Sequence, residues 1–147
     1  MDLTCCFPVD FATPEYDETV GLRYNILRKP LNMVFEENDL ALEFDSFHIA
    51  CYLVQTMDLL GCLVLKPLDA GRIKMRQVAV RDDMQGKGIG RFMVEYAASY
   101  AAGKGFQKMV LHARMPATAF YQRLGYNIEG DVFQEVGIDH LFMYKQL

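Results

Sequence analysis

The chain has no tryptophan, only three histidines and no excess of basic residues. Its 15 lysines and arginines against 19 aspartates and glutamates leave a net charge of −4. A general nucleic-acid binder needs a basic surface to displace phosphate counterions. No apolar run approaches the roughly 18 residues that a membrane-spanning helix needs. We therefore expect neither nucleic acid nor a membrane among its partners.

The first residues lack the basic segment and the apolar core of a secretory signal, so we expect a cytoplasmic protein. The four cysteines, at positions 5, 6, 51 and 62, show neither zinc-knuckle spacing nor a C-x-x-C motif. We expect reduced thiols and no metal site. With 52% apolar and 23% charged residues, the chain has the composition of one globular domain over residues 1–147.

The hydrophobic pattern alternates between strand and helix periods, which predicts an α/β fold with a mixed sheet. The expected strands cover residues 3–9, 48–55, 59–65, 71–80, 109–113, 133–136 and 141–144. The last two would form a hairpin across Gly137-Ile138. Helices are expected over residues 14–31, from residue 89 to the glycines at 103 and 105, and over 116–124. Residues 36–39, EEND, are expected to be a polar loop.

A glycine-rich loop, QGKGIG at residues 85–90, precedes the second expected helix. Glycine permits positive φ and close approach of a ligand, and the first turn of a helix presents unpaired N–H groups to anions. Lys87 and Arg91 add positive charge. A Walker A loop is excluded because Gly88 follows Lys87, and a Rossmann fingerprint because Arg91 stands at a required glycine. The loop is interpreted as an anion site, and a simple chain turn is the alternative.

Four segments, in this order and spacing, resemble GNAT acetyltransferases. Residues 77–80, QVAV, resemble the cofactor-binding strand of that family, and residues 85–90 resemble its (Arg/Gln)-x-x-Gly-x-(Gly/Ala) signature. Residues 117–126, ATAFYQRLGY, are similar to its A-x-x-F-Y-x-x-x-G-F block. Residues 135–143, EVGIDHLFM, resemble the E-x-G-I-x-H-x-x-M ending of the ElaA-like subgroup. The resemblance spans nearly the whole chain.

The resemblance implies a three-layer α+β fold whose mixed, mostly antiparallel sheet splays open to bind acetyl-CoA. The backbone of Val78, Ala79 and Val80 would pair with the pantetheine arm as an added strand does. The pyrophosphate would be held by Arg91 and the loop residues Gln85, Gly86, Lys87, Gly88, Ile89 and Gly90. Phe120 and Arg123 would line the thiol and nucleotide side. Arg114 stands where the family often has asparagine, which removes one hydrogen bond to the coenzyme.

Acetyl transfer to an amine needs a base and, to a lesser degree, an acid. An alkylammonium group has a pKa of about 10.4, so removing its proton at neutral pH costs roughly 4–5 kcal/mol. The leaving thiol has a pKa of about 8.5 and therefore needs less help from an acid. By the resemblance, Tyr121 is the leaving-group acid. The sequence does not select a base from among a carboxylate acting through water and the side chains His112, His140, Glu135, Asp45 and His48.

The acceptor amine is not identified by the sequence. Its walls are expected from residues 18–31, the loop at Phe44-Asp45 and the Gly137-Ile138 turn, where acidic residues only slightly favour a cationic amine. Two other interpretations of the function stay open. The protein could bind coenzyme A without turnover, or it could be an interaction module. The apolar strands near the C-terminal end are compatible with a homodimer.

Overall fold

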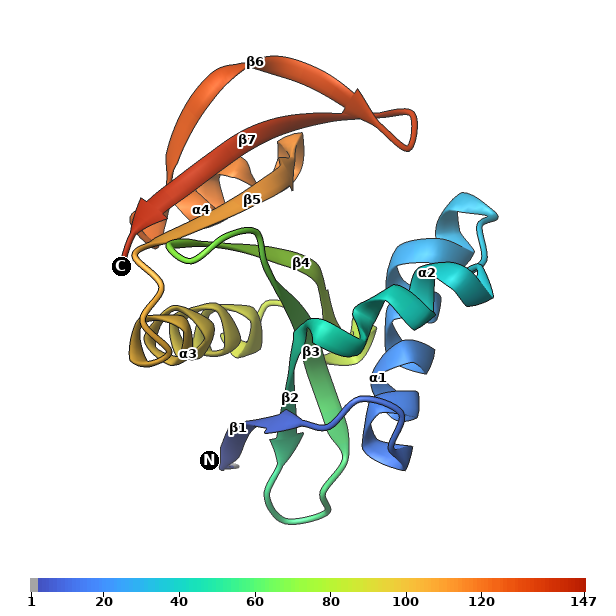
Figure 1. The fold of residues 1–147 in the computed structure, drawn as a ribbon. Coiled ribbons are helices and arrows are strands. Elements are labelled where there is room, and N and C mark those ends of the chain that lie inside the picture. Colours follow the sequence, from blue (N-terminus) through green and yellow to red (C-terminus); the bar gives the residue numbers. More distant parts are fainter. Residues whose placement is uncertain (1–2) are drawn as a thin grey trace.

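The computed structural model describes residues 3–147, in which seven strands form one sheet in the order β1-β2-β3-β4-β5-β7-β6 (Figure 1). The strands are β1 Thr4–Val9, β2 Phe47–Leu53, β3 Leu59–Pro67, β4 Arg72–Val80, β5 Lys108–Arg114, β6 Asn127–Glu135 and β7 Ile138–Gln146. Within the described residues, β4 and β5 pair in parallel and the other neighbours are antiparallel. The expected mixed, mostly antiparallel sheet is confirmed.

Helices cover both faces of this sheet. The helix α1, Pro14–Arg23, continues as a π-helical turn, Tyr24–Arg28, and a 3-10 turn, Lys29–Leu31. The other helices are α2 Glu37–Ala41, α3 Ile89–Gly103 and α4 Thr118–Arg123. Figure 1 shows α1 and α2 on one side of β2, β3 and β4, and α3 on the other. Over residues 3–147, no helix combines the length and apolarity that crossing a membrane requires.

Two of the elements predicted from the sequence differ from those in the structure. Residues 36–39 are not a loop, because α2 begins at Glu37. Acidic side chains in a first turn stabilise the positive end of a helix, and a helix as short and exposed as α2 shows little hydrophobic period. The closing hairpin is also longer than expected: β6 is exposed along most of its length, so its sequence lacks the alternation of a half-buried strand.

The core lies between α3 and the sheet. The buried face of α3 carries Ile89, Met93 and Ala97 at steps of four, as the helical period predicts. Contact between α3 and β3 is close at Gly61, where an added Cβ would lie 2.7 Å from the sulfur of Met93. A side chain at position 61 would therefore displace the end of the Met93 side chain and crowd the Ala79 carbonyl oxygen, which lies 3.1 Å from that Cβ.

A bulge in β4 opens the sheet. Arg76 pairs with Val64 of β3 and Ala79 pairs with Cys62, so β4 has one residue more than its partner over this interval. Gln77, inside the bulge, has a φ of +55°. The parallel pairing of β4 with β5 stops at Met75 and Leu111, just before the bulge. A bulge bends and twists its strand. The two strands therefore splay beyond Met75, and the β5-facing edge of residues 78–80 is left without a strand partner.

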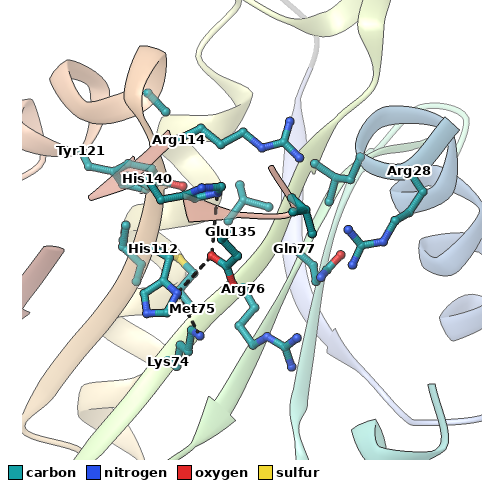
Figure 2. Close-up of a pocket in the computed structure, with 16 residues that line it drawn as sticks. Arg28, Lys74, Met75, Arg76, Gln77, His112, Arg114, Tyr121, Glu135 and His140 are labelled. Atoms are coloured by element: carbon teal, nitrogen blue, oxygen red, sulfur yellow. Dashed lines mark hydrogen bonds and ion pairs between the residues drawn. The ribbon is translucent and has the colours of Figure 1, made fainter. Parts of the chain in front are cut away.

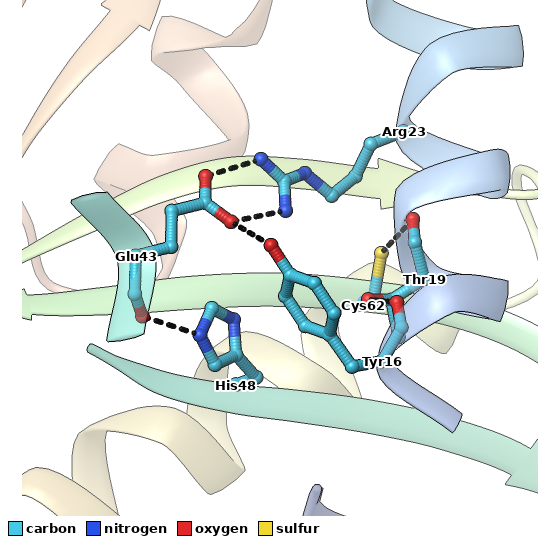
Figure 3. Close-up of polar contacts among 6 residues, drawn as sticks. All are labelled: Tyr16, Thr19, Arg23, Glu43, His48 and Cys62. Carbon is cyan, nitrogen blue, oxygen red and sulfur yellow. Dashed lines mark hydrogen bonds and ion pairs between the residues drawn. The ribbon is translucent and has the colours of Figure 1, made fainter. Parts of the chain in front are cut away.

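A buried polar network holds α1 against the sheet (Figure 3). Arg23 of α1 forms two hydrogen bonds to the carboxylate of Glu43, which lies in a 3-10 turn, Leu42–Asp45, ahead of β2. The Tyr16 hydroxyl donates to the same carboxylate at 2.8 Å, and His48 Nε2 lies 3.0 Å from the Glu43 carbonyl oxygen. This network fixes the path of α1 and of the π-helical turn that follows it.

Candidate active site

A cavity of about 370 Å³ opens where β4 and β5 separate (Figure 2). Its walls are residues 74–78 of β4, residues 111–114 of β5, Leu27 and Arg28 of the π-helical turn, Ala117 and Tyr121 beside and within α4, and Glu135, Val136 and His140 of the closing hairpin. Five separate segments thus meet at the splay. A second cavity of about 300 Å³ shares Arg28, Arg76 and Gln77 with it.

Tyr121 lines this cavity from α4, and its side chain is only 8% exposed. Burial raises the pKa of the Tyr121 hydroxyl to about 12. The phenol is therefore protonated at neutral pH. In the described part of the chain no hydrogen-bond acceptor is recorded for this O–H, so its proton is free to be donated to a group in the cavity.

The glycine loop has the backbone conformation of an anion site. Gly86 and Gly88 have φ values of +75° and +86°, and Gly88 is the residue from which α3 begins. An added Cβ would meet nothing within 4 Å at either position. Glycine is thus required by the dihedral angles, and the space above the loop is open. Among residues 3–147, no acceptor is recorded for the N–H groups of residues 86–89. Such a set of free N–H groups at a helix start fits a diphosphate.

Gln85 and Phe120 tie the loop to the splayed strand. The Gln85 amide donates to the carbonyl oxygen of Val80 at 3.0 Å, so the loop is anchored to the end of β4. Phe120 of α4 would lie 3.5 Å from a Cβ added at Gly90. The start of α3, the end of β4 and α4 therefore form one contiguous surface.

The structure places the other sequence-predicted cofactor residues in three kinds of position. Val78 lines the cavity, whereas the side chains of Ala79 and Ile89 are buried in the core, so that only their backbones can meet a ligand. The exposed side chains of Lys87, Arg91 and Arg123 lie outside the cavity. Arg91 forms an ion pair with Glu95 at 2.8 Å. The roles of all these residues stay predictions.

Two histidines meet one carboxylate on the opposite wall. Glu135 Oε2 lies 3.1 Å from His112 Nδ1 and 3.8 Å from His140 Nε2. His140 Nδ1 lies 2.8 Å from the carbonyl oxygen of Ile138, to which it must donate a proton because a carbonyl only accepts. In a neutral imidazole the lone pair is then on Nε2, the nitrogen nearer Glu135.

His112 lies between a positively and a negatively charged side chain. Its Nδ1 also lies 3.4 Å from Lys74 Nζ, and one nitrogen cannot both accept from Lys74 and donate to Glu135. Burial and the positive charge of Lys74 lower the pKa of His112 below its ordinary value, and Glu135 opposes this shift. The other candidate bases, His48 and Asp45, do not line the cavity, and His48 belongs to the buried network of α1.

Cationic residues of the cavity were missed by the sequence analysis as site residues. Arg28, Lys74 and Arg76 all line it, while Glu135 is its one carboxylate within residues 3–147. The sequence predicts acceptor walls that mix apolar and acidic residues, whereas the side chains that line this cavity include more cationic than acidic groups. The alternation of Arg72, Lys74 and Arg76 places these side chains on one face of β4, and such an alternation is also typical of a solvated strand face.

Comparison with known proteins gives the family. Residues 4–126 match the sequence profile of the acetyltransferase (GNAT) family. The uncharacterized N-acetyltransferase YjcF of Bacillus subtilis is 28% identical over 132 residues, which cover 84% of this chain and 87% of YjcF. The uncharacterized protein YyaT of the same organism is 31% identical over 74 residues, so this match spans half the length of each chain.

Solved structures share the fold. The crystal structure of Escherichia coli ElaA is 18% identical with a TM-score of 0.78 over 99% of each chain. A GNAT family acetyltransferase from Elizabethkingia anophelis with acetyl-CoA bound is 20% identical with a TM-score of 0.73 over 98% of each chain. The profile match includes the splayed strands, the glycine loop and Tyr121. The chain therefore belongs to the acetyltransferase (GNAT) family, whose activity is acyl transfer from acetyl-CoA.

Proposed function

We propose that this protein is an N-acetyltransferase that moves the acetyl group of acetyl-CoA to a primary amine by direct attack in a ternary complex. The observation that carries the proposal is that one cavity, at the splay of β4 and β5, is lined by a protonated tyrosine and by a histidine–carboxylate cluster. An acid and a base beside the same space are what acyl transfer to an amine requires.

The residues of the splay fit the coenzyme. The edge of residues 78–80 would pair with the amide-bearing arm, and the N–H groups of residues 86–89 would bind the pyrophosphate. When bound, acetyl-CoA supplies a thioester carbonyl that is open to attack. Tyr121, with its pKa raised to about 12 by burial, would donate its proton to the sulfur as the thiol leaves.

We assign the base to His140, supported by Glu135. The His140 Nε2 lone pair and the Glu135 carboxylate lie 3.8 Å apart, and two acceptors at this distance repel each other. A proton taken from the amine at Nε2 would face the Glu135 carboxylate. The Nδ1 bond to Ile138 keeps the His140 ring in that orientation.

The test measures binding and turnover separately. Calorimetry with acetyl-CoA reports binding, and a thiol reagent reports release of coenzyme A with a panel of primary amines, with acetylated products identified by mass spectrometry. Acetyl-CoA at about 100 times its Kd should raise the unfolding free energy by roughly 2.7 kcal/mol. Binding without amine-dependent thiol release would point to the non-catalytic coenzyme-binding alternative, and no binding to the interaction module. Either result would overturn the proposed function.

A further inference from the structure

We propose that the acceptor amine carries an anionic group, a carboxylate or a phosphate, which is bound by Arg28, Arg76 and Arg114. This inference rests on the proposed function and names the substrate class of the same site. The three arginines come from three segments, the π-helical turn, β4 and β5, and all line the cavity. Figure 2 shows the side chains of Arg28 and Arg114 extending toward each other from opposite walls.

These three arginines lack the carboxylate partners that most other arginines of the chain have. Within the described residues, ion pairs to aspartate or glutamate are made by Arg23, Arg72, Arg81 and Arg91. No carboxylate lies within ion-pair distance of Arg28, Arg76 or Arg114 over residues 3–147. The protein has a net charge of −4, so its acidic residues outnumber its basic ones. A shortage of carboxylates therefore does not explain why three arginines around one cavity form no ion pair.

The arginines repel one another. The pKa of Arg28 lies below its ordinary value, first because of burial and then because of the charges of Arg23, Arg114 and Arg76, while the charge of Asp39 opposes the shift. Like charges held together in a partly enclosed space raise the free energy of the unliganded protein, and a bound anion relieves this repulsion. Guanidinium groups also match the geometry of carboxylate and phosphate oxygens, to which they can donate two hydrogen bonds at once.

Arg28 is held in place before any ligand binds. The guanidinium groups of Arg23 and Arg28 each lie 4.8 Å from the ring centroid of Phe35. Arg23 is itself fixed by its two bonds to Glu43. The Arg28 side chain of the π-helical turn is thus held against the Phe35 ring. Less side-chain entropy is then lost when an anion binds to it.

The cavity holds both a proton-accepting cluster and the arginines. Glu135 and the two histidines, beside which the amine would lose its proton, line the same space as the three arginines, and Arg114 is the cross-strand neighbour of His140. Gln77 lines this cavity and the second cavity together with Arg28 and Arg76. A volume of about 370 Å³ is at the small end of ligand pockets. These features fit a small molecule with an amine and an anion a few bonds apart, as in an amino acid.

The experiment compares amines that differ in one charged group. The protein is saturated with coenzyme A and titrated in a calorimeter with O-phosphoethanolamine against ethanolamine, and with β-alanine against β-alanine amide. We expect the amine that carries the anionic group to bind at least about 10-fold more tightly than its partner without that group, since a charged hydrogen bond is worth about 1.5–3 kcal/mol. Arg76→Gln and Arg114→Gln should each lower this ratio about 10-fold, whereas Arg72→Gln, on the same strand and outside the cavity, should not.

Each result has a definite meaning. A preference confined to O-phosphoethanolamine identifies the anion as phosphate, and a preference confined to β-alanine identifies it as carboxylate. Equal or absent binding of all four amines overturns the inference, and so does an Arg72→Gln variant that loses the preference as Arg76→Gln does. Coenzyme binding is measured first, so failure of the proposed function is seen separately. Acetylation of amines without the anionic group as efficiently as of those with it would keep the proposed function and overturn the anionic substrate class.

Discussion

The guanidinium of Arg23 and the carboxylate of Glu43 form a two-pronged ion pair inside the protein, with Nη1–Oε1 and Nη2–Oε2 distances of 2.9 Å and 2.6 Å (Figure 3). Both residues are nearly inaccessible to solvent, at 1% and 5% exposed. Hydrogen bonds from Arg23 and its positive charge hold the pKa of Glu43 below its ordinary value, against the opposing effect of burial. The pair is therefore charged on both sides at neutral pH.

Removal of one partner should be costly. Glu43→Ala leaves the Arg23 charge buried and unpaired, so we expect the free energy of unfolding to fall by about 3–5 kcal/mol. Denaturant titration measures this loss. The matched control is Glu95→Ala, which breaks the exposed pair with Arg91 and should cost no more than about 1 kcal/mol. If the two variants lost similar unfolding free energies, burial of the Arg23–Glu43 pair would not make it more important to stability than an exposed pair.

His48 should make the fold sensitive to acid. Burial lowers the pKa of His48 below its ordinary value, although contacts with Glu43 oppose the shift. The unfolded chain, with a histidine pKa of about 6.5, then binds more protons than the folded chain near and below that pH. The stabilising contribution is therefore complete above pH 6.5 and is lost as the pH falls through the lower, folded-state pKa.

The measurement is the free energy of unfolding between pH 8 and pH 5. His48→Gln keeps a side-chain N–H that can donate to the Glu43 carbonyl oxygen but cannot gain a proton. We expect this variant to lose less stability than the wild type on acidification over that interval. His112→Asn should act in the same direction because burial and Lys74 lower the pKa of His112 as well. An unaltered slope in His48→Gln would remove His48 as a source of acid sensitivity.

Two neighbouring tyrosines allow a controlled test of the leaving-group acid. Tyr121 and Tyr126 have ring centroids 5.7 Å apart, and both are buried. Of the two, Tyr121 lines the cavity, while the Tyr126 hydroxyl is buried and has no hydrogen-bond partner among residues 3–147. We expect Tyr121→Phe to lower kcat by about 10–100-fold with little change in coenzyme affinity. Tyr126→Phe should leave kcat unchanged. Equal kcat in Tyr121→Phe and wild type would exclude Tyr121 as the acid.

The glycine loop can be tested through its backbone angles. Gly86→Ala and Gly88→Ala place a Cβ on residues with positive φ, which costs about 1–2 kcal/mol of local strain although the space is open. The loop should relax and its N–H groups lose their alignment, so we expect a higher Kd for acetyl-CoA with fold and kcat retained. Gly103→Ala is the control, since a helical glycine replaced by alanine is neutral or stabilising. Unchanged affinity in both loop variants would argue against a backbone anion site.

The sequence predicts those features that depend on residues close together in the chain better than those that depend on residues far apart in it. The helix α3 and its glycine loop follow from neighbours in the chain, namely a period of four among Ile89, Met93 and Ala97 and glycines that permit positive φ. The bulge at Gln77 has no such local signal. A non-glycine residue adopts positive φ there because β4 must match β3 with one residue to spare.

The residues predicted for the coenzyme lie in local motifs, whereas the cationic residues of the cavity do not. Tyr121, residues 78–80 and residues 85–90 belong to segments that resemble a known family, so each could be named from sequence, and their roles stay predictions. Arg28, Arg76 and Arg114 are far apart in the chain, and only the splay of the sheet brings them to one cavity. Their charges look like ordinary surface charges until the fold shows that no carboxylate of residues 3–147 pairs with them.

The choice of base is decided by the pH dependence of kcat. If His140 removes the amine proton, His140→Gln leaves deprotonation to the solvent, and kcat should fall by about 100-fold at pH 7. That loss should shrink by up to tenfold for each pH unit of increase, because a larger fraction of the amine is then already neutral. His112→Asn should show no such rescue, since the proposed base is His140 and His112 contacts Glu135 at 3.1 Å without taking the amine proton. A loss in His140→Gln that is equally large at pH 7 and pH 9 would mean that His140 serves the structure of the hairpin, through its bond to Ile138, and that the proton goes elsewhere.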